Sequence, residues 1–282
     1  MESPPLPMNP VKAIYLACGC LVLLGIILTA TTDGEPYNTL MVLPITIAAA
    51  VYSLSPQIMW WWWKRNPPDL PTDLAPLLER FDLYRKLDLA GKREFRRRTF
   101  LLKEAIHLHG QAIDEFPDDV RIMVAASAAT VTYHRTEFLL DHYDTVIFYR
   151  HLFPSPQHEV LHASEIHTQD GAIIWTLNIF LRSVVEPQKY LQLGFYEFYR
   201  ALFHLEPKLR TELSDVALTY GEIEQISNFG EAALKEFVGL PELDLAAITA
   251  TLYHTHAAPF AAQQALKAKR VNDLLTNKVV PV

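Results

Sequence analysis

The sequence predicts a mostly helical α+β domain with a small sheet, preceded by a hairpin of two transmembrane helices. Two long uncharged segments near the N-terminus indicate the hairpin. Amphipathic stretches separated by short β-branched and aromatic runs indicate the α+β domain. We therefore expect three parts: a transmembrane hairpin over residues 1–66, a proline-rich linker over 67–73 and one soluble domain over 74–282.

The expected hairpin consists of residues 13–31, nineteen residues without a charge, and residues 40–63, twenty-four without a charge. A helix needs about 20 apolar residues to cross the hydrocarbon core of a bilayer. Residues 32–38 form a polar segment with two acids between them. A connection this short predicts that the two helices run antiparallel.

The second apolar segment should end or kink at Pro56. Its last part would then lie at the membrane interface, where tryptophan is favoured. The residues expected there are Trp60, Trp61, Trp62, Trp63, Lys64 and Arg65. The basic residues of the hairpin, Lys12 with Lys64 and Arg65, all lie outside the polar turn. By the positive-inside rule, both termini and the soluble domain should face the cytoplasm.

The charge distribution excludes some partners. The net charge is −7, and residues 1–66 carry three basic and three acidic residues, so the whole excess lies on the soluble part. An acidic domain argues against nonspecific binding to nucleic acid or anionic lipid. A basic run at residues 92–98 includes a glutamate and is expected to be a solvated helix face. The two cysteines, Cys18 and Cys20, lie in the first apolar segment, so cysteine-based chemistry is not expected in the soluble domain.

The secondary structure of the soluble domain follows from periodicity and punctuation. One or two short helices are expected at 74–89, an amphipathic helix at 92–106 and a buried alanine-rich helix at 120–133. An aspartate of Pro117-Asp118-Asp119 is available as the N-cap of that last helix. Short strands are expected at 145–149 and 171–176. Residues 188–275 are expected to be helical, with breaks near 206–207, 228–230 and 239–241.

The sharpest motif is His158-Glu159-Val160-Leu161-His162, which fits H-E-x-x-H. On a helix, His158 and His162 would share a face and bind one zinc, and Glu159 would act as general base on the bound water. Glu165 or His167 could supply a third ligand. The prolines before the motif and Gln169-Asp170-Gly171 after it leave room for only about ten helical residues. The alternative is a polar surface loop between two strands.

The other histidine pairs are expected to be structural. His107 and His109 alternate as they would on one face of a strand, without a carboxylate partner nearby in the sequence. His254 and His256 are interpreted in the same way. The sequence contains no glycine-rich phosphate loop and no G-x-S-x-G motif, so it gives no indication of nucleotide binding or serine hydrolase chemistry.

Several segments in a fixed order resemble the Mlc titration factor A family of zinc-dependent peptidases. They are Phe100-Leu101-Leu102-Lys103 and residues 113–129, 141–149, 159–161 and 171–175. The resemblance covers roughly residues 74–278. It implies a metallopeptidase-like, gluzincin-like fold in which one helix carries H-E-x-x-H.

The resemblance places that helix at residues 193–200, where the motif positions hold Tyr196, Glu197 and Arg200. A glutamate on a later helix is the family's third ligand, and its position falls at about Ala250. Tyrosine, arginine and alanine cannot replace two imidazoles and a carboxylate around Zn²⁺. The resemblance thus implies a lost metal site, filled by an ion pair of Glu197 and Arg200. It also places His158 and His162 in a region without a metal role.

The leading hypothesis is a membrane-anchored, catalytically inactive peptidase homologue without a cofactor. It would act as a binding or scaffold subunit at the cytoplasmic face of a bacterial inner membrane, with the bilayer and another membrane protein as partners. The alternative is an active zinc-dependent metallopeptidase that uses His158, Glu159 and His162. A nucleic-acid-binding regulator is disfavoured by the acidic charge.

Overall fold

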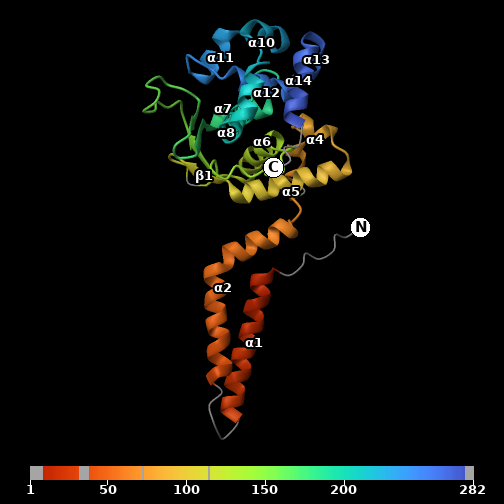
Figure 1. The fold of residues 1–282 in the computed structure, drawn as a ribbon. Helices are drawn as coiled ribbons and strands as arrows, with labels where there is room; N and C mark the ends of the chain where they lie inside the picture. Colours follow the sequence, from red (N-terminus) through yellow and green to blue (C-terminus); the bar gives the residue numbers. More distant parts are fainter. Residues whose placement is uncertain (1–8, 32–37, 72, 114, 277–282) are drawn as a thin grey trace. The chain divides into compact units, whose positions relative to one another are not determined.

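The computed structural model describes residues 9–31, 38–71, 73–113 and 115–276, and its contacts divide the chain into two compact units, Met1–Pro68 and Asp69–Val282. The first unit holds α1 (Pro10–Thr31) and α2 (Asn38–Arg65), which pack side by side (Figure 1). Both are long and apolar enough to cross a membrane. Only 11% of each apolar window is buried, whereas the core helix of a soluble protein is mostly buried.

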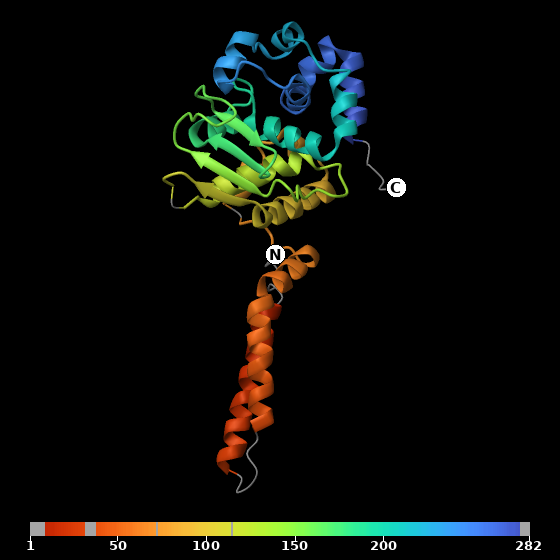
Figure 2. The ribbon, with the colours of Figure 1, turned by 60° about the vertical axis from the view of Figure 1, so that its left-hand side comes forward.

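The helix α2 bends in its C-terminal third (Figures 1 and 2). Pro56 lies inside the helix and removes a backbone hydrogen bond, which is the usual cause of such a bend. After the bend, the ammonium of Lys64 lies 5.2 Å from the ring centre of Trp60, and the Arg65 guanidinium lies 3.9 Å from that of Trp61. The predicted polar turn lies almost entirely outside the described residues.

The second unit is mostly helical with a small sheet, as the sequence predicts. Its first helices are α3 (Ala75–Leu78), α4 (Asp82–Lys86), α5 (Leu89–Ala105), α6 (Asp118–Val131), α7 (Leu177–Val185) and α8 (Leu193–Leu205). They are followed by α9 (Pro207–Ser214), α10 (Tyr220–Ser227), α11 (Glu231–Val238), α12 (Leu245–Thr255), α13 (Ala257–Gln263) and α14 (Ala265–Thr276). The strands are β1 (His107–Gly110), β2 (Thr145–Tyr149), β3 (Ser164–His167) and β4 (Ala172–Thr176).

The sheet has the order β1-β2-β4-β3, with β1, β2 and β4 parallel and β3 antiparallel at one edge. In register, Val146 lies opposite Ile173 and Phe148 opposite Trp175, and all four side chains are buried. On the opposite face, Thr145, Ile147 and Tyr149 of β2 and Ile174 of β4 are only partly buried, whereas Ala172 and Thr176 at the ends of β4 are buried. Helices therefore cover one face of the sheet (Figure 2).

The helix α8 is the centre of the domain, because it contacts α6, α7, α9, α12 and β3. Its close contact with α6 depends on small residues: a Cβ at Gly194 would lie 2.7 Å from the Ser127 hydroxyl oxygen. Ser127 also accepts a hydrogen bond from the Gln192 side chain at 3.2 Å. The side chains of α8 are thereby fixed in the core.

One local prediction about α6 is wrong, and one about α5 holds only in part. The N-cap of α6 is Pro117 and not an aspartate, since Asp118 already belongs to the helix. The basic run is not simply a solvated face: the Arg98 guanidinium donates to the carbonyl oxygens of Thr132 and Arg135 at 3.0 and 2.9 Å. It thus satisfies the carbonyl oxygen of Thr132, the C-cap of α6, and that of Arg135 in the segment after the helix.

The segmentation of the C-terminal half is finer than predicted. The three expected breaks are present, but the chain also breaks between α9 and α10 and on both sides of α13. The segment before α8 is not helical from residue 188. Helix α7 and strand β3 were not predicted from the sequence.

Candidate functional site

The candidate site is built on α8, which places Tyr196 and Glu197 in the domain core and Arg200 at its partly exposed edge. The helix begins after Gln192, whose side chain accepts a hydrogen bond from the backbone N–H of Phe195. Tyr196 and Glu197 are 1% and 0% exposed. The chain thus buries a carboxylate, which requires hydrogen-bonding partners that compensate for the loss of water.

Arg200 and Ser164 supply those partners. One guanidinium nitrogen of Arg200, Nη1, lies 3.0 Å from Oε1 and 2.8 Å from Oε2 of Glu197. The Ser164 hydroxyl, on the edge strand β3, donates to Oε1. Burial raises the pKa of the Glu197 carboxyl, while Arg200 and the Ser164 hydrogen bond act against that rise. With these donors on its two oxygens, the Glu197 carboxylate is held in an internal ion pair.

Tyr196 lies against the same pair. The ring centre of Tyr196 is 5.5 Å from the Arg200 guanidinium, and its hydroxyl accepts a hydrogen bond from the backbone N–H of Asp244 at 3.1 Å. Burial raises the pKa of the Tyr196 hydroxyl, so the phenol is neutral at physiological pH. Asp244 is the N-cap of α12, so this contact ties the start of α12 to α8.

Ala250 lies on α12, which packs against α8, and is 0% exposed. The structure thus brings Tyr196, Glu197 and Arg200 together and places Ala250 on the helix packed against them. These positions offer a neutral phenol, an engaged carboxylate, a fixed cation and a methyl group. Such a set supplies no ligand combination suited to a divalent cation.

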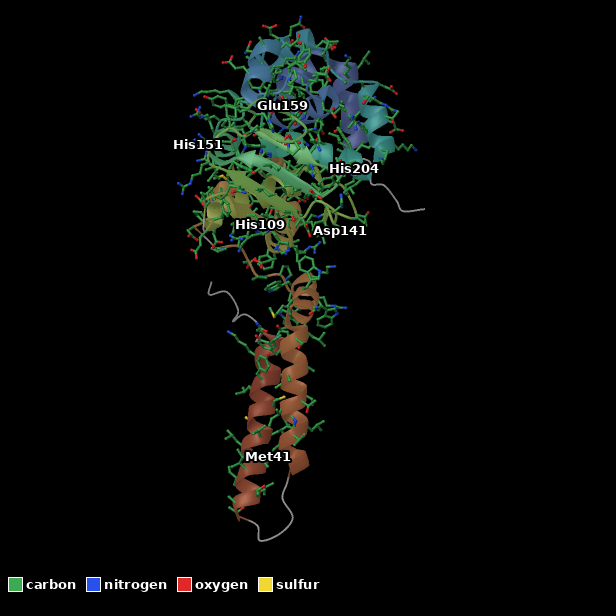
Figure 3. The ribbon with its side chains drawn as sticks, turned by 90° about the vertical axis from the view of Figure 1, so that its left-hand side faces the viewer. Met41, His109, Asp141, His151, Glu159 and His204 are labelled. Carbon is green, nitrogen blue, oxygen red and sulfur yellow. The ribbon has the colours of Figure 1, made fainter. Side chains whose placement is uncertain are left out.

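The H-E-x-x-H motif is not helical. His158 to His162 lie in an irregular segment between β2 and β3, which ends in an isolated antiparallel bridge of His162 with Phe153. The imidazole rings of His158 and His162 are 5.7 Å apart between centres and perpendicular, and Glu159 is exposed (Figure 3). The helical face that would bring the two imidazoles onto one metal is therefore missing.

The alternative, a surface loop between two strands, holds for most of the segment, since Gln157 and residues 159–161 are exposed. His162 at its end is the exception, because it is 0% exposed. Its Nδ1 lies 2.8 Å from the carbonyl oxygen of Val160, and its Nε2 lies 3.1 Å from Oε2 of Glu165. Glu165 accepts a further hydrogen bond from the Ser155 hydroxyl at 2.9 Å. Both ring nitrogens are thus engaged, and Glu165 orients His162 instead of serving as a third metal ligand.

Gly239 allows the end of α11 to lie in close contact with the backbone of this segment. It ends α11 with φ of +85°, a left-handed conformation that glycine adopts without strain. A Cβ at this position would lie 2.5 Å from the carbonyl oxygen of Leu161 and from the Cα of His162. The backbone of the motif therefore rests directly on the end of α11.

The serine, histidine and glutamate of this cluster do not form a hydrolytic triad. In such a triad the histidine lies between the serine and the acid. Here Glu165 lies between Ser155 and His162, so the serine hydroxyl faces a carboxylate and not the imidazole that a triad requires. The other proposed ligand, His167, instead pairs with Asp170 at 2.9 Å.

The remaining histidines do not form a metal cluster. His109, His151 and His204 lie on separate parts of the domain (Figure 3). Nε2 of His254 shares a hydrogen bond with the Tyr199 hydroxyl on α8, and burial lowers the pKa of His254 to about 3. Across residues 9–31, 38–71, 73–113 and 115–276, no group of three or more His, Cys, Asp or Glu side chains is arranged to hold a metal ion.

Ser155, Ser164, Glu165 and Asp244 take part in these networks, although sequence reasoning assigns no role to three of them and a metal-ligand role to Glu165. Ser164 and Asp244 reach their partners on α8 from elements that are distant in the sequence. Glu165 is only three residues from His162, but their contact depends on the irregular backbone of this segment. No family model, curated protein or solved structure matches the chain.

Proposed function

We propose that this chain is a membrane-anchored protein whose soluble domain acts by binding and not by catalysis. The observation that carries the proposal is the closed state of Glu197, whose two oxygens are occupied by Arg200 and Ser164 inside the core. A general base must have an oxygen available for the proton of a substrate or a bound water. Both oxygens of Glu197 already accept hydrogen bonds and the residue is 0% exposed, so neither oxygen is accessible to a substrate or a bound water.

The second step of the argument concerns the metal. A catalytic zinc site needs three protein ligands and an open position for water. At the positions that the family resemblance assigns to ligands, Tyr196 is a neutral phenol and Ala250 has no ligand atom. Arg200 adds a permanent positive charge, which repels a cation. Each of the three positions therefore disfavours zinc.

The proposed fold of the soluble domain is that of the Mlc titration factor A family, in an inactive form. Two features support this assignment. The helix α8 lies at the centre of the domain, where an active-site helix would be, and it contacts the edge strand β3. The later helix α12, which carries Ala250, packs directly against α8.

The anchor is proposed to be the pair α1 and α2, inserted in a bacterial inner membrane. Large apolar side chains such as Leu16, Leu23 and Leu43 are 60–63% exposed on this unit, which suits contact with lipid or with another membrane protein. The placement of Lys12, Lys64 and Arg65 supports a cytoplasmic location for both termini and the soluble domain. We propose that the partner is another membrane protein.

The test uses the full chain. Its membranes are washed with alkaline carbonate, and the protein is then purified in mild detergent and assayed with a fluorescent unfolded protein substrate in the presence of zinc. We expect the chain to stay in the membrane pellet and to show the same background hydrolysis as its Glu197→Gln and Glu159→Gln variants. Hydrolysis that disappears in Glu159→Gln alone would instead establish a peptidase that uses the H-E-x-x-H motif.

A further inference from the structure

A cavity of about 400 Å³ opens between α7, α11 and the segment that joins α7 to α8. Most of the side chains that line it are apolar or aromatic, among them Ile179, Tyr190, Leu234 and Phe237. Neither Glu197 nor Arg200 belongs to the lining, so the cavity is separate from the candidate site above. A volume of a few hundred Å³ with apolar walls and few polar groups is typical of sites for small molecules.

The walls offer a flat surface. The rings of Tyr190 and Phe237 are stacked, with centres 5.4 Å apart and planes 23° apart. Tyr190 comes from the segment before α8 and Phe237 from α11, so the stack joins two parts of the chain. Leu152 also lines the cavity and is 42% exposed. An apolar ligand would remove this surface from water and pack against the aromatic pair.

Arg182 provides the polar anchor. It lines the cavity from the last turn of α7, and its guanidinium lies 5.6 Å from the ring centre of Tyr190. It forms no ion pair within the part of the chain that the structure describes. The neighbouring Lys189, by contrast, is paired with Glu186 at 2.6 Å. Stacking on a ring leaves the edge N–H groups of a guanidinium available, and their fork matches a carboxylate.

Glu236 limits the charge of the ligand. It also lines the cavity and forms no ion pair with any described residue. A ligand with a second negative charge would be repelled by this carboxylate, whereas a ligand with one negative charge can reach Arg182. The cavity therefore favours a monoanion with an apolar body.

We propose that this cavity binds small aromatic monocarboxylates. The carboxylate would pair with Arg182, and the aromatic body would pack against Tyr190 and Phe237. This inference does not depend on the proposed function, because it concerns a different part of the domain.

The experiment measures binding of a fluoronaphthoate and of its neutral amide to the full chain in mild detergent, by fluorine NMR. We expect saturable binding of the naphthoate with Kd below about 1 mM, and weaker binding of the amide. Arg182→Gln should weaken the naphthoate by at least about tenfold and the amide by less than about twofold. Ala233→Trp, which fills the cavity from α11, should weaken both ligands by at least about tenfold.

Two control variants separate this site from others. Arg210→Gln removes an arginine that is 60% exposed on α9 and should leave both ligands unchanged. Ala261→Phe fills a different cavity of about 410 Å³ beside Phe260 and should also have no effect. The proposal is overturned if binding is not saturable, if the acid and amide bind equally, or if Arg182→Gln leaves the preference for the acid intact. Loss of binding in Ala261→Phe with no change in Ala233→Trp would also overturn it.

Discussion

The ion pair of Glu197 and Arg200 gives the sharpest prediction about stability. Arg200→Met replaces the guanidinium with an apolar side chain and leaves a carboxylate that is 0% exposed, with Ser164 as its remaining donor among the described residues. Removing one partner of a buried ion pair costs about 3–5 kcal/mol. Because the Arg200 side chain is 24% exposed, water can reach the position that it vacates. We therefore expect the lower end, a loss of about 3 kcal/mol in the free energy of unfolding.

The loss should depend on the charge of Glu197. Burial already raises the pKa of this carboxyl, and Arg200 lowers it, so the variant should raise the pKa further. When the pKa of a carboxyl is higher in the folded state than in the unfolded state, its charged form destabilises the fold. The loss of stability therefore appears as the pH rises above the pKa of the unfolded state. The stability deficit of Arg200→Met should thus be larger at pH 8 than at pH 5. Adding Glu197→Gln should recover about 1–2 kcal/mol at neutral pH, because it removes the unpaired charge.

The assay is urea denaturation of the full chain in mild detergent, followed by circular dichroism and extrapolated linearly. Arg210→Met is the matched control, since Arg210 is 60% exposed and lies 3.6 Å from Asp244. Exposed pairs contribute little, so the control should differ from the wild type by less than about 0.5 kcal/mol. If Arg200→Met is as stable as this control at every pH, the pair is not buried in solution and the reasoning is refuted.

Three further predictions concern other parts of the chain. Gly239→Ala should lower the free energy of unfolding, measured by thermal denaturation, by at least about 2 kcal/mol, because Gly239 has a left-handed φ and its Cβ would clash with the backbone of residues 161–162. The control Gly221→Ala has open space around it and should not destabilise the protein. The pKa of His254 is lowered to about 3 from 6.5, so the free energy of unfolding should fall as the pH drops below about 6.5, by at most about 1.4 kcal/mol per pH unit. His254→Gln should reduce this slope, and an equal slope in the variant would refute a neutral buried imidazole. A reporter that is active only outside the cytoplasm should stay silent when fused after Val282, and an active fusion would reverse the proposed orientation.

The sequence predicts the elements whose signal is long or repeated. The two apolar segments are recognised because their uncharged length is itself the property that a membrane selects. The buried helix α6 is recognised from its alanine-rich apolar run, and β2 and β4 from their β-branched and aromatic residues. In these cases the local sequence and the tertiary environment favour the same structure.

Elements with weak local signals were missed. The strand β3 reads Ser-Glu-Ile-His, which has little strand propensity, and it forms because β4 pairs with it at the sheet edge. The H-E-x-x-H spacing suggested a helical metal site, but spacing carries no information about the backbone. The prolines before it and the left-handed Gly239 packed against it favour an irregular segment instead.

The site was predictable only in part. Glu197 and Arg200 are one helical turn apart, so an ion pair between them follows from helix geometry. The role of Ser164 depends on β3 lying against α8, and that of Asp244 on α12 lying against α8, and neither contact can be derived from local patterns. The pairing of Glu165 with His162 likewise required the fold of the segment before β3.

The zinc content of the full chain, purified without chelator, tests the central claim most directly. A triple variant serves as the positive control, because it rebuilds the three ligands that the family resemblance implies: Tyr196→His, Arg200→His and Ala250→Glu. This variant should gain zinc if the proposed fold is right. For the wild type and for the His158→Ala, His162→Ala double variant, we predict far less than about one zinc per chain. About one zinc per chain in the wild type, lost in the double variant, would contradict the account and identify the H-E-x-x-H segment as a metal site.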